Sequence, residues 1–171
     1  MASRQVDFSN AFIQSELAKG EEIYVDVPRG FVDLTTELKV LKLHRSLYGL
    51  VQAPLYWGNQ LKLVLEKEGL KQSVSDPCMF IRDGMIALTY VDNVLFFGPS
   101  KANIDAKIKS LQQKGFKLTV EDDVSAYLGV EVKQLPSGEI EMKQNGLIVK
   151  VLEACGMMNC NTKATPCNAE P

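Results

Sequence analysis

Two acidic positions in apolar surroundings are the residues of this chain whose types could support chemistry. Asp7 lies between Val6 and Phe8, and Asp92 interrupts a strongly apolar run with Asn93 directly after it. Asp and Asn are depleted from strands and frequent in turns, so a plain hairpin is the simpler explanation of the second pair. Two acids at the ends of adjacent strands could also share a divalent metal through their oxygen atoms. Taken alone, the pattern favours the hairpin slightly and leaves the metal site open.

The segments around Asp92 predict strands joined by tight turns. Apolar runs at 78–81 and 85–91 flank Asp83-Gly84, a strong hairpin signal, and a further run at 94–97 follows the polar pair almost at once. Glu22 to Val27 alternates acidic and apolar residues, which is the period of a half-exposed strand. We therefore expect antiparallel strands, with Asp92 and Asn93 at a turn.

Two helices are delimited by capping residues. Pro54 suits the first turn of one helix, and Gly69 suits the position just past its end. Ser100 is a favourable N-cap for a second helix that continues to Lys114, where Gly115 follows. The order of strands and helices predicts an α+β fold, an antiparallel sheet with two main helices on one face.

Composition limits the partners. The 171 residues suffice for one core, and the net charge of −2, with dispersed Lys and Arg, argues against a self-sufficient nucleic-acid binder. No apolar run approaches the roughly 20 residues of a membrane span, and the N-terminus lacks a signal-peptide pattern, so no membrane partner is expected. Four cysteines in a chain of this length indicate a reducing compartment rather than a disulfide framework, and the lack of a C-x-x-C pair favours free thiols over a metal site.

Short motifs follow one another along nearly the whole chain. They are VDFSNAF at 6–12, IYVDVPRGF at 23–31, SLYGLVQAP at 46–54 with Trp57 after it, SDPCMF at 75–80, YLGVEV at 127–132 and ATP at 164–166. In sequence and order they resemble the motifs of copia-type reverse transcriptases, the RNA-dependent DNA polymerase domain of LTR-retrotransposon Pol polyproteins. The chain is identified from them as a member of that family.

The resemblance implies a palm that adds deoxynucleotides to a primer 3′-hydroxyl on an RNA or DNA template. It implies catalytic roles for Asp7, Asp92 and the position of Asn93, with two Mg²⁺ (or Mn²⁺) ions held by Asp7 and Asp92.

The resemblance also implies three substrate-binding residues. Phe12 would lie beneath the incoming sugar, where an aromatic ring excludes a 2′-hydroxyl. Gln52 would contact the nucleotide and the template, and Tyr90 would line the primer terminus. From the residues alone, Phe12 and Tyr90 could be plain core aromatics and Gln52 a helix-entry residue.

The resemblance gives a domain division and a set of partners. It predicts an incomplete palm without N-terminal fingers at 1–133, a hairpin and short helix at the palm–thumb junction at 134–158, and a polar tail at 159–171. The expected partners are template-primer, deoxynucleotide triphosphates and the remaining polyprotein segments (fingers, thumb, RNase H and integrase). The expected location is a cytoplasmic virus-like particle.

The chain departs from the family at Asn93, where the family has Asp. A carboxylate about 4 Å from a divalent ion contributes roughly 8 kcal/mol at an effective dielectric near 20, before desolvation. Loss of even a quarter of that energy, about 2 kcal/mol, lowers the rate more than tenfold. We therefore expect impaired catalysis.

Two alternatives to a working polymerase follow. One is an inactive palm remnant of a retrotransposon polyprotein. The other is a ferredoxin-like nucleic-acid-binding module without chemistry, although the sequence lacks the aromatic pattern that such modules use for stacking.

Overall fold

The structure, a computed structural model, describes residues 2–30, 40–121, 126–137 and 139–163. The chain divides into two compact units, Met1–Asp123 and Val124–Pro171. This division falls inside the segment 1–133 that the sequence assigns to the palm. The palm assignment itself stays a prediction, and residues 164–171 of the expected polar tail, with the last family motif, lie outside the described residues.

The first unit contains a six-stranded sheet in the order β4-β5-β6-β7-β1-β8, and every pair of neighbours is antiparallel. The first strand of the chain therefore lies inside the sheet, between two strands that follow it much later in sequence. The strands are β1 (Ala2–Phe8), β4 (Lys71–Gln72), β5 (Met79–Arg82), β6 (Met85–Tyr90), β7 (Asn93–Gly98) and β8 (Leu118–Glu121). The expected antiparallel sheet is confirmed.

The two main helices of this unit begin and end close to the predicted capping residues. Helix α2 (Ala53–Lys67) has Pro54 in its first turn, and helix α3 (Lys101–Gln113) begins after Ser100, whose side-chain oxygen accepts the Asn103 N–H at 3.2 Å. Gly69 and Gly115 follow the two helices with φ of +89° and +92°. Glycine adopts this left-handed conformation without strain, which explains why the helices stop there.

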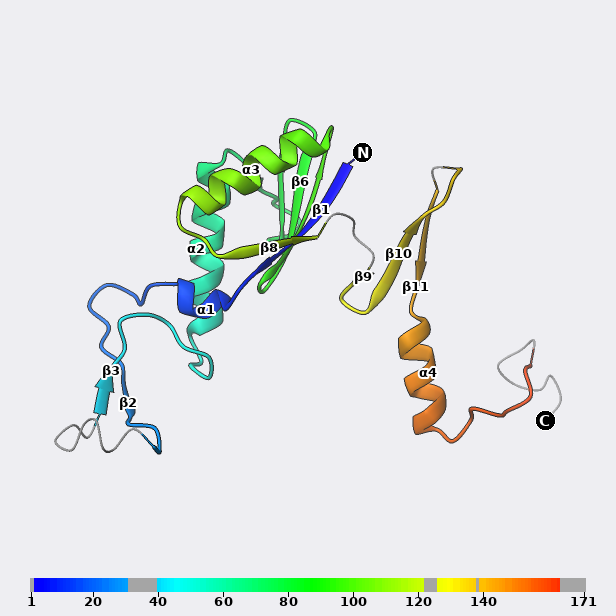
Figure 1. Cartoon of the computed structure of the whole chain (residues 1–171), viewed down its shortest axis with the longest axis horizontal. Coiled ribbons are helices and arrows are strands. Elements are labelled where there is room, and N and C mark those ends of the chain that lie inside the picture. Colours follow the sequence, from blue (N-terminus) through cyan, green and yellow to red (C-terminus); the bar gives the residue numbers. More distant parts are fainter. Residues whose placement is uncertain (1, 31–39, 122–125, 138, 164–171) are drawn as a thin grey trace. The chain divides into compact units, whose positions relative to one another are not determined.

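Helices α2 and α3 cover one face of the sheet (Figure 1). Val6 of β1 is the register partner of Val94 of β7, and both side chains are fully buried. Successive side chains of a strand point to opposite faces, so the neighbours of Val6 and Val94 lie on the face away from the helices. The shared core consists of Val6, Phe8, Phe80, Met85, Ala87, Val94 and Phe96 of the sheet, Trp57, Leu61, Val64 and Leu65 of α2, and Ile104, Ile108 and Leu111 of α3.

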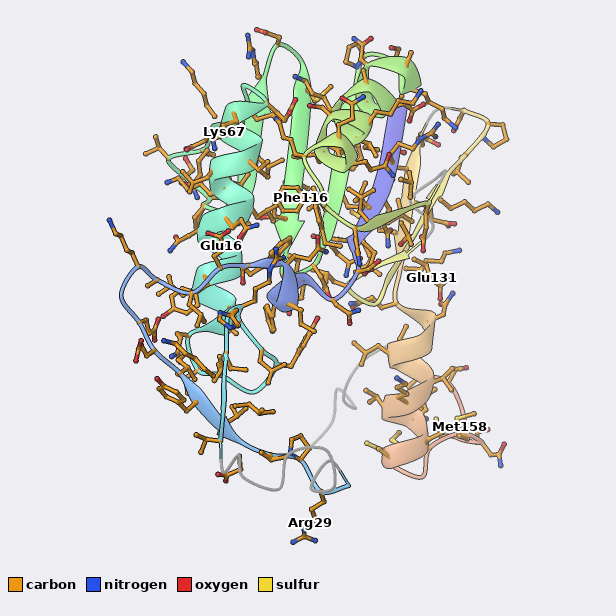
Figure 2. All side chains as sticks on the ribbon, turned by 60° about the vertical axis from the view of Figure 1, so that its left-hand side comes forward. Glu16, Arg29, Lys67, Phe116, Glu131 and Met158 are labelled. Atoms are coloured by element: carbon orange, nitrogen blue, oxygen red, sulfur yellow. The ribbon has the colours of Figure 1, made fainter. Side chains whose placement is uncertain are left out.

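Aromatic rings fill the centre of this core. Phe8 makes edge contacts with Trp57 at 5.1 Å and with Phe116 at 5.8 Å between ring centroids. Figure 2 shows Phe116 between the two helices, over the sheet. Edge-to-face pairs of this kind add stabilisation beyond the buried area.

Smaller elements complete the two units. Helix α1 (Ala11–Gln14) follows β1, and β2 (Tyr24–Asp26) pairs antiparallel with β3 (Val40–Lys42) in a separate hairpin. The second unit has a three-stranded antiparallel sheet, β11-β10-β9, and helix α4. Its elements are β9 (Ala126–Tyr127), β10 (Val130–Gln134), β11 (Ile140–Lys143) and α4 (Asn145–Ala154). Across the described part of the chain, no helix is long and apolar enough to cross a membrane.

A buried carboxylate joins α2 to α3. Glu68, only 8% exposed at the C-cap of α2, accepts hydrogen bonds from Ser110 Oγ at 2.6 Å, from Lys107 Nζ at 3.4 Å and from Lys114 Nζ. Burial raises the pKa of Glu68, but the bonds from Lys114 and Ser110 outweigh it, so the pKa lies below its usual 4.5. Glu68 therefore stabilises the fold in its charged form.

We predict that Glu68→Gln lowers the free energy of unfolding by about 1–2 kcal/mol at pH 7, because it removes the charge that the two lysines bind. The loss is no larger because both lysines are partly solvated. Since the folded pKa is lowered, this contribution is complete above the usual pKa of 4.5 and is lost as the pH falls through the folded value. Urea unfolding at pH 7 and pH 3 measures both effects. Glu66→Gln, an exposed change on the same helix, is the control, and an equal loss in both variants would contradict the prediction.

Candidate active site

The register of the sheet brings the two predicted catalytic acids together. Asp7 of β1 is the partner of Asn93, the first residue of β7, and Asp92 precedes it in the turn after β6. The Phe8 N–H donates to the Asp92 carbonyl at 2.8 Å, which ties the turn to the end of β1. Asp7 lies on the face away from the helices, because Val6 and Phe8 on either side of it are buried beneath them.

Asp7 is in an electrostatic environment that disfavours its charge. Partial burial raises its pKa above the usual 3.8, and the nearby carboxylates of Asp92 and Glu121 raise it further. Glu121 is on β8, opposite Gln5 and on the same face of the sheet as Asp7. Sequence reasoning missed Glu121, because its proximity depends on β8 pairing with β1, and no local pattern shows that pairing.

The side chain of Asn93 is hydrogen-bonded to that of Asp92. Its side-chain Nδ2 donates a hydrogen bond to Asp92 Oδ1 at 3.1 Å. An amide donor therefore occupies one acceptor site of Asp92, where a carboxylate at position 93 would leave that oxygen free for a cation. The Asn93 side chain thus carries no charge and engages the carboxylate of Asp92.

The turn itself has an unusual backbone. Val91 has a φ of +52°. A β-branched residue rarely adopts positive φ, since its side chain then crowds the backbone, and such strain persists only where the surroundings impose it. The turn that presents Asp92 is therefore held by its neighbours.

Phe12 and Tyr90 lie on one cavity of about 500 Å³, next to the turn. Its wall also includes Trp57, Pro54 and Val91. Tyr90 is half exposed, so it is no core aromatic, whereas Phe12 is partly buried and packs against the hydrophobic core. The structure thus brings these two predicted substrate residues together on one cavity, whose lining reaches Val91 but includes neither Asp7 nor Asp92.

Gln52 does not line this cavity, and its amide is engaged elsewhere. Gln52 Nε2 donates to Glu21 Oε1 at 2.9 Å, and the Tyr56 hydroxyl donates to the other oxygen of Glu21. The hydrogen bond from Tyr56 and then that from Gln52 lower the pKa of Glu21. Glu21 therefore joins the loop before β2 to the start of α2, a contact that sequence analysis did not foresee.

The donor set suits a divalent cation only in part. Asp7 and Asp92 supply oxygen ligands, and a cation would offset the repulsion that, after burial, raises the pKa of Asp7. Among the described residues, however, no group of three or more His, Cys, Asp or Glu side chains is placed to hold a metal ion. Asp7 and Asp92 fit a weak site, and their metal role stays a prediction.

Similarity to known proteins shows the family of this chain. Residues 2–169 match the reverse transcriptase (RNA-dependent DNA polymerase) family. Since the match covers nearly the whole chain, this protein belongs to that family, and the resemblance to its copia-type members is confirmed.

Curated relatives are retrotransposon proteins. The chain is 32% identical to the retrovirus-related Pol polyprotein from transposon RE2 of Arabidopsis thaliana, over 98% of this chain and 12% of that protein. It is 33% identical to the Pol polyprotein from transposon TNT 1-94 of Nicotiana tabacum, over 95% of this chain and 12% of that protein. A putative transposon Ty5-1 protein of Saccharomyces cerevisiae is 30% identical over 97% of this chain and 54% of its own length.

We predict that part of the rise in the Asp7 pKa, beyond the part that burial causes, depends on its two acidic neighbours. Asp92→Asn should lower the Asp7 pKa towards 3.8, and Glu121→Gln should lower it by less, in line with the order of their effects. Carboxyl NMR titration of the metal-free chain measures the shift, with Glu66→Gln as the control. An unchanged Asp7 pKa in both neighbour variants would refute the electrostatic coupling.

The same shift predicts a stability effect of opposite sign to that of Glu68. Because the folded pKa of Asp7 is raised, the folded state binds more protons than the unfolded state between 3.8 and the raised value, so stability falls as the pH rises through that range. Asp7→Asn should therefore stabilise the metal-free chain at pH 7 and give little gain at pH 3. Thermal unfolding at both pH values measures this, and destabilisation at pH 7 would contradict it.

Proposed function

We propose that this chain is the catalytic palm of a retrotransposon reverse transcriptase, with polymerisation reduced by Asn93. The single observation that carries the proposal is the juxtaposition of Asp7 and Asp92 at adjacent strand ends, in a chain of this family whose Phe12 and Tyr90 line a cavity next to the turn. The reaction is the template-directed addition of a deoxynucleotide to a primer 3′-hydroxyl, on RNA or DNA.

Asp7 and Asp92 would hold the Mg²⁺ (or Mn²⁺) ions. The chemistry supplied there by bound ions would be activation of the 3′-hydroxyl for attack on the α-phosphate and neutralisation of charge on the leaving oxygen. In the metal-free chain, the Asp7 pKa above 3.8 reflects burial and unrelieved repulsion from Asp92 and Glu121, which a cation would offset.

The aromatic residues beside the acids would position the substrates. Phe12 packs on Tyr48, with 4.6 Å between the ring centroids, so its ring has support for excluding a ribose 2′-hydroxyl. Tyr90 ends β6 immediately before the turn and would contact the primer terminus. Gln52 would contact the nucleotide and the template, and this role requires its amide to exchange Glu21 for the substrate or to bind both.

Asn93 reduces metal binding in two ways. It lacks the charge that the family carries at this position, and its amide donates to Asp92 Oδ1. Each effect weakens the hold on a divalent ion, and together they exceed a tenfold loss by the Coulomb estimate of about 2 kcal/mol or more.

We predict that Asn93→Asp raises primer extension by at least tenfold, on a homopolymer RNA template with a DNA primer and Mg²⁺, because it restores the missing carboxylate. Steady-state incorporation of a single deoxynucleotide measures the gain. Asp7→Asn in the Asn93→Asp background is the control and should abolish extension.

Two outcomes would contradict the proposal in different ways. Equal, measurable extension by the natural chain and by Asn93→Asp would refute the impairment by Asn93. No extension by either chain would support an inactive palm remnant. Salt-sensitive RNA binding that Mg²⁺ leaves unchanged would then favour a binding module without chemistry.

The polyprotein context is also proposed. The chain spans about 12% of the length of the first two relatives described, and a net charge of −2 gives it little general attraction for nucleic acid. The remaining segments (fingers, thumb, RNase H and integrase) would supply much of the basic surface that binds template-primer, within a cytoplasmic virus-like particle.

A further inference from the structure

Trp57 contacts both strand ends that present the acids. Its side chain is 1% exposed on α2, and it is the only tryptophan of the chain. The indole Nε1–H donates to the carbonyl of Val91, and the ring packs edge-on against Phe8 at 5.1 Å. Val91 directly precedes Asp92, and Phe8 directly follows Asp7.

The hydrogen bond falls where the turn is strained. Val91 has a φ of +52° although it is β-branched, so its conformation needs external support. Two bonds supply that support from different elements. Trp57 holds the Val91 carbonyl from α2, and the Phe8 N–H holds the Asp92 carbonyl from β1.

We propose that Trp57 is a positioning residue that fixes the turn at Asp92 relative to Asp7 and so sets the spacing of the two carboxylates. This inference rests on the proposed metal role of the two acids. Trp57 would touch no reacting atom and would act through the Val91 carbonyl and the Phe8 ring.

A purely structural role for Trp57 makes a different prediction. Its ring is part of the hydrophobic core and makes a further edge contact with Phe116 at 6.3 Å. If packing were its only role, an analogue of the same shape without the N–H group would serve equally well. The positioning role requires the N–H group at Nε1, whereas the packing role does not, so a change at this atom distinguishes the two roles.

The experiment replaces Trp57 by β-(3-benzothienyl)alanine, which keeps the bicyclic shape and has sulfur in place of the N–H group. It is performed on the full chain, in the natural sequence and in the Asn93→Asp variant. The first readout is Mn²⁺ affinity, measured by electron paramagnetic resonance. The second, which needs no metal, is hydrogen exchange of the Phe8 amide, whose acceptor is the Asp92 carbonyl.

We expect Mn²⁺ affinity to fall roughly tenfold, the lower end of what loss of a supporting contact does to a metal site. Exchange of the Phe8 amide should become at least about tenfold faster, because the turn loses the bond that holds the Val91 carbonyl to α2. The Ser73 amide, which bonds the Met79 carbonyl at 2.7 Å in another part of the sheet, should exchange as before.

Phe116→Leu is the matched control, since it loosens the same aromatic cluster without removing a bond to the turn. It should lower thermal stability. It should leave unchanged the Mn²⁺ affinity and the ratio of the amide hydrogen-exchange rates of Phe8 and Ser73. Equal effects of the control and the analogue would overturn the positioning role.

The outcomes distinguish this inference from the proposed function. Unchanged Phe8 exchange in the analogue overturns the role of Trp57, whether or not metal binds. Absence of Mn²⁺ binding in Asn93→Asp, or binding that persists in Asp7→Asn, overturns the metal role of the acids and with it the spacing function of Trp57. Mn²⁺ binding that is lost in Asp7→Asn and weakened in the analogue supports both.

Discussion

The pairing of β1 with β7 is the interaction on which the rest of the structure depends. Through it the first strand of the chain lies between two later strands, and Asp7 comes opposite Asn93. The same register puts Val6 opposite Val94 under the helices. Because side chains alternate along a strand, one pairing decides both what is buried and what faces the open side.

Helix α2 links this pairing to the surroundings of the site. Trp57, on its buried side, donates a hydrogen bond to the turn before Asp92. A carboxylate accepts hydrogen bonds at each end of the helix, Glu21 near the first turn and Glu68 at the last. The core, the turn and the loop before β2 are therefore joined through one rigid element. The charges at either end differ in setting, since Glu68 is buried and paired with lysines whereas Glu21 accepts from neutral groups.

Much of the fold was predictable from local signals. Pro54, Ser100 and the glycines after both helices defined their ends, and alternation with turn residues defined the strands. The turn at Asp92 was predictable as a turn, and its relation to Asp7 came from family resemblance. Glu121 beside Asp7 and Glu21 beneath Gln52 were not predictable, because long-range pairing creates those contacts and leaves no periodic trace in the sequence. The same holds for the bond from Trp57 to Val91, since a tryptophan on an apolar helix face predicts burial and not the partner of its N–H group.

The separation of the two sheet faces has an evolutionary consequence. Asp7, Asp92 and Asn93 contribute little to the core, and the raised pKa of Asp7 means that its charge opposes folding. If the acids have the proposed catalytic role, point substitutions at these positions would stop catalysis while the protein still folds. A one-residue insertion in β1 would instead move its buried side chains to the open face of the sheet and its open ones to the buried face. Such an insertion would disrupt the core and the arrangement of the acids at once. On the proposed function, a transposon lineage under relaxed selection would accumulate well-folded descendants with altered acids, and Asn93 would be such a change.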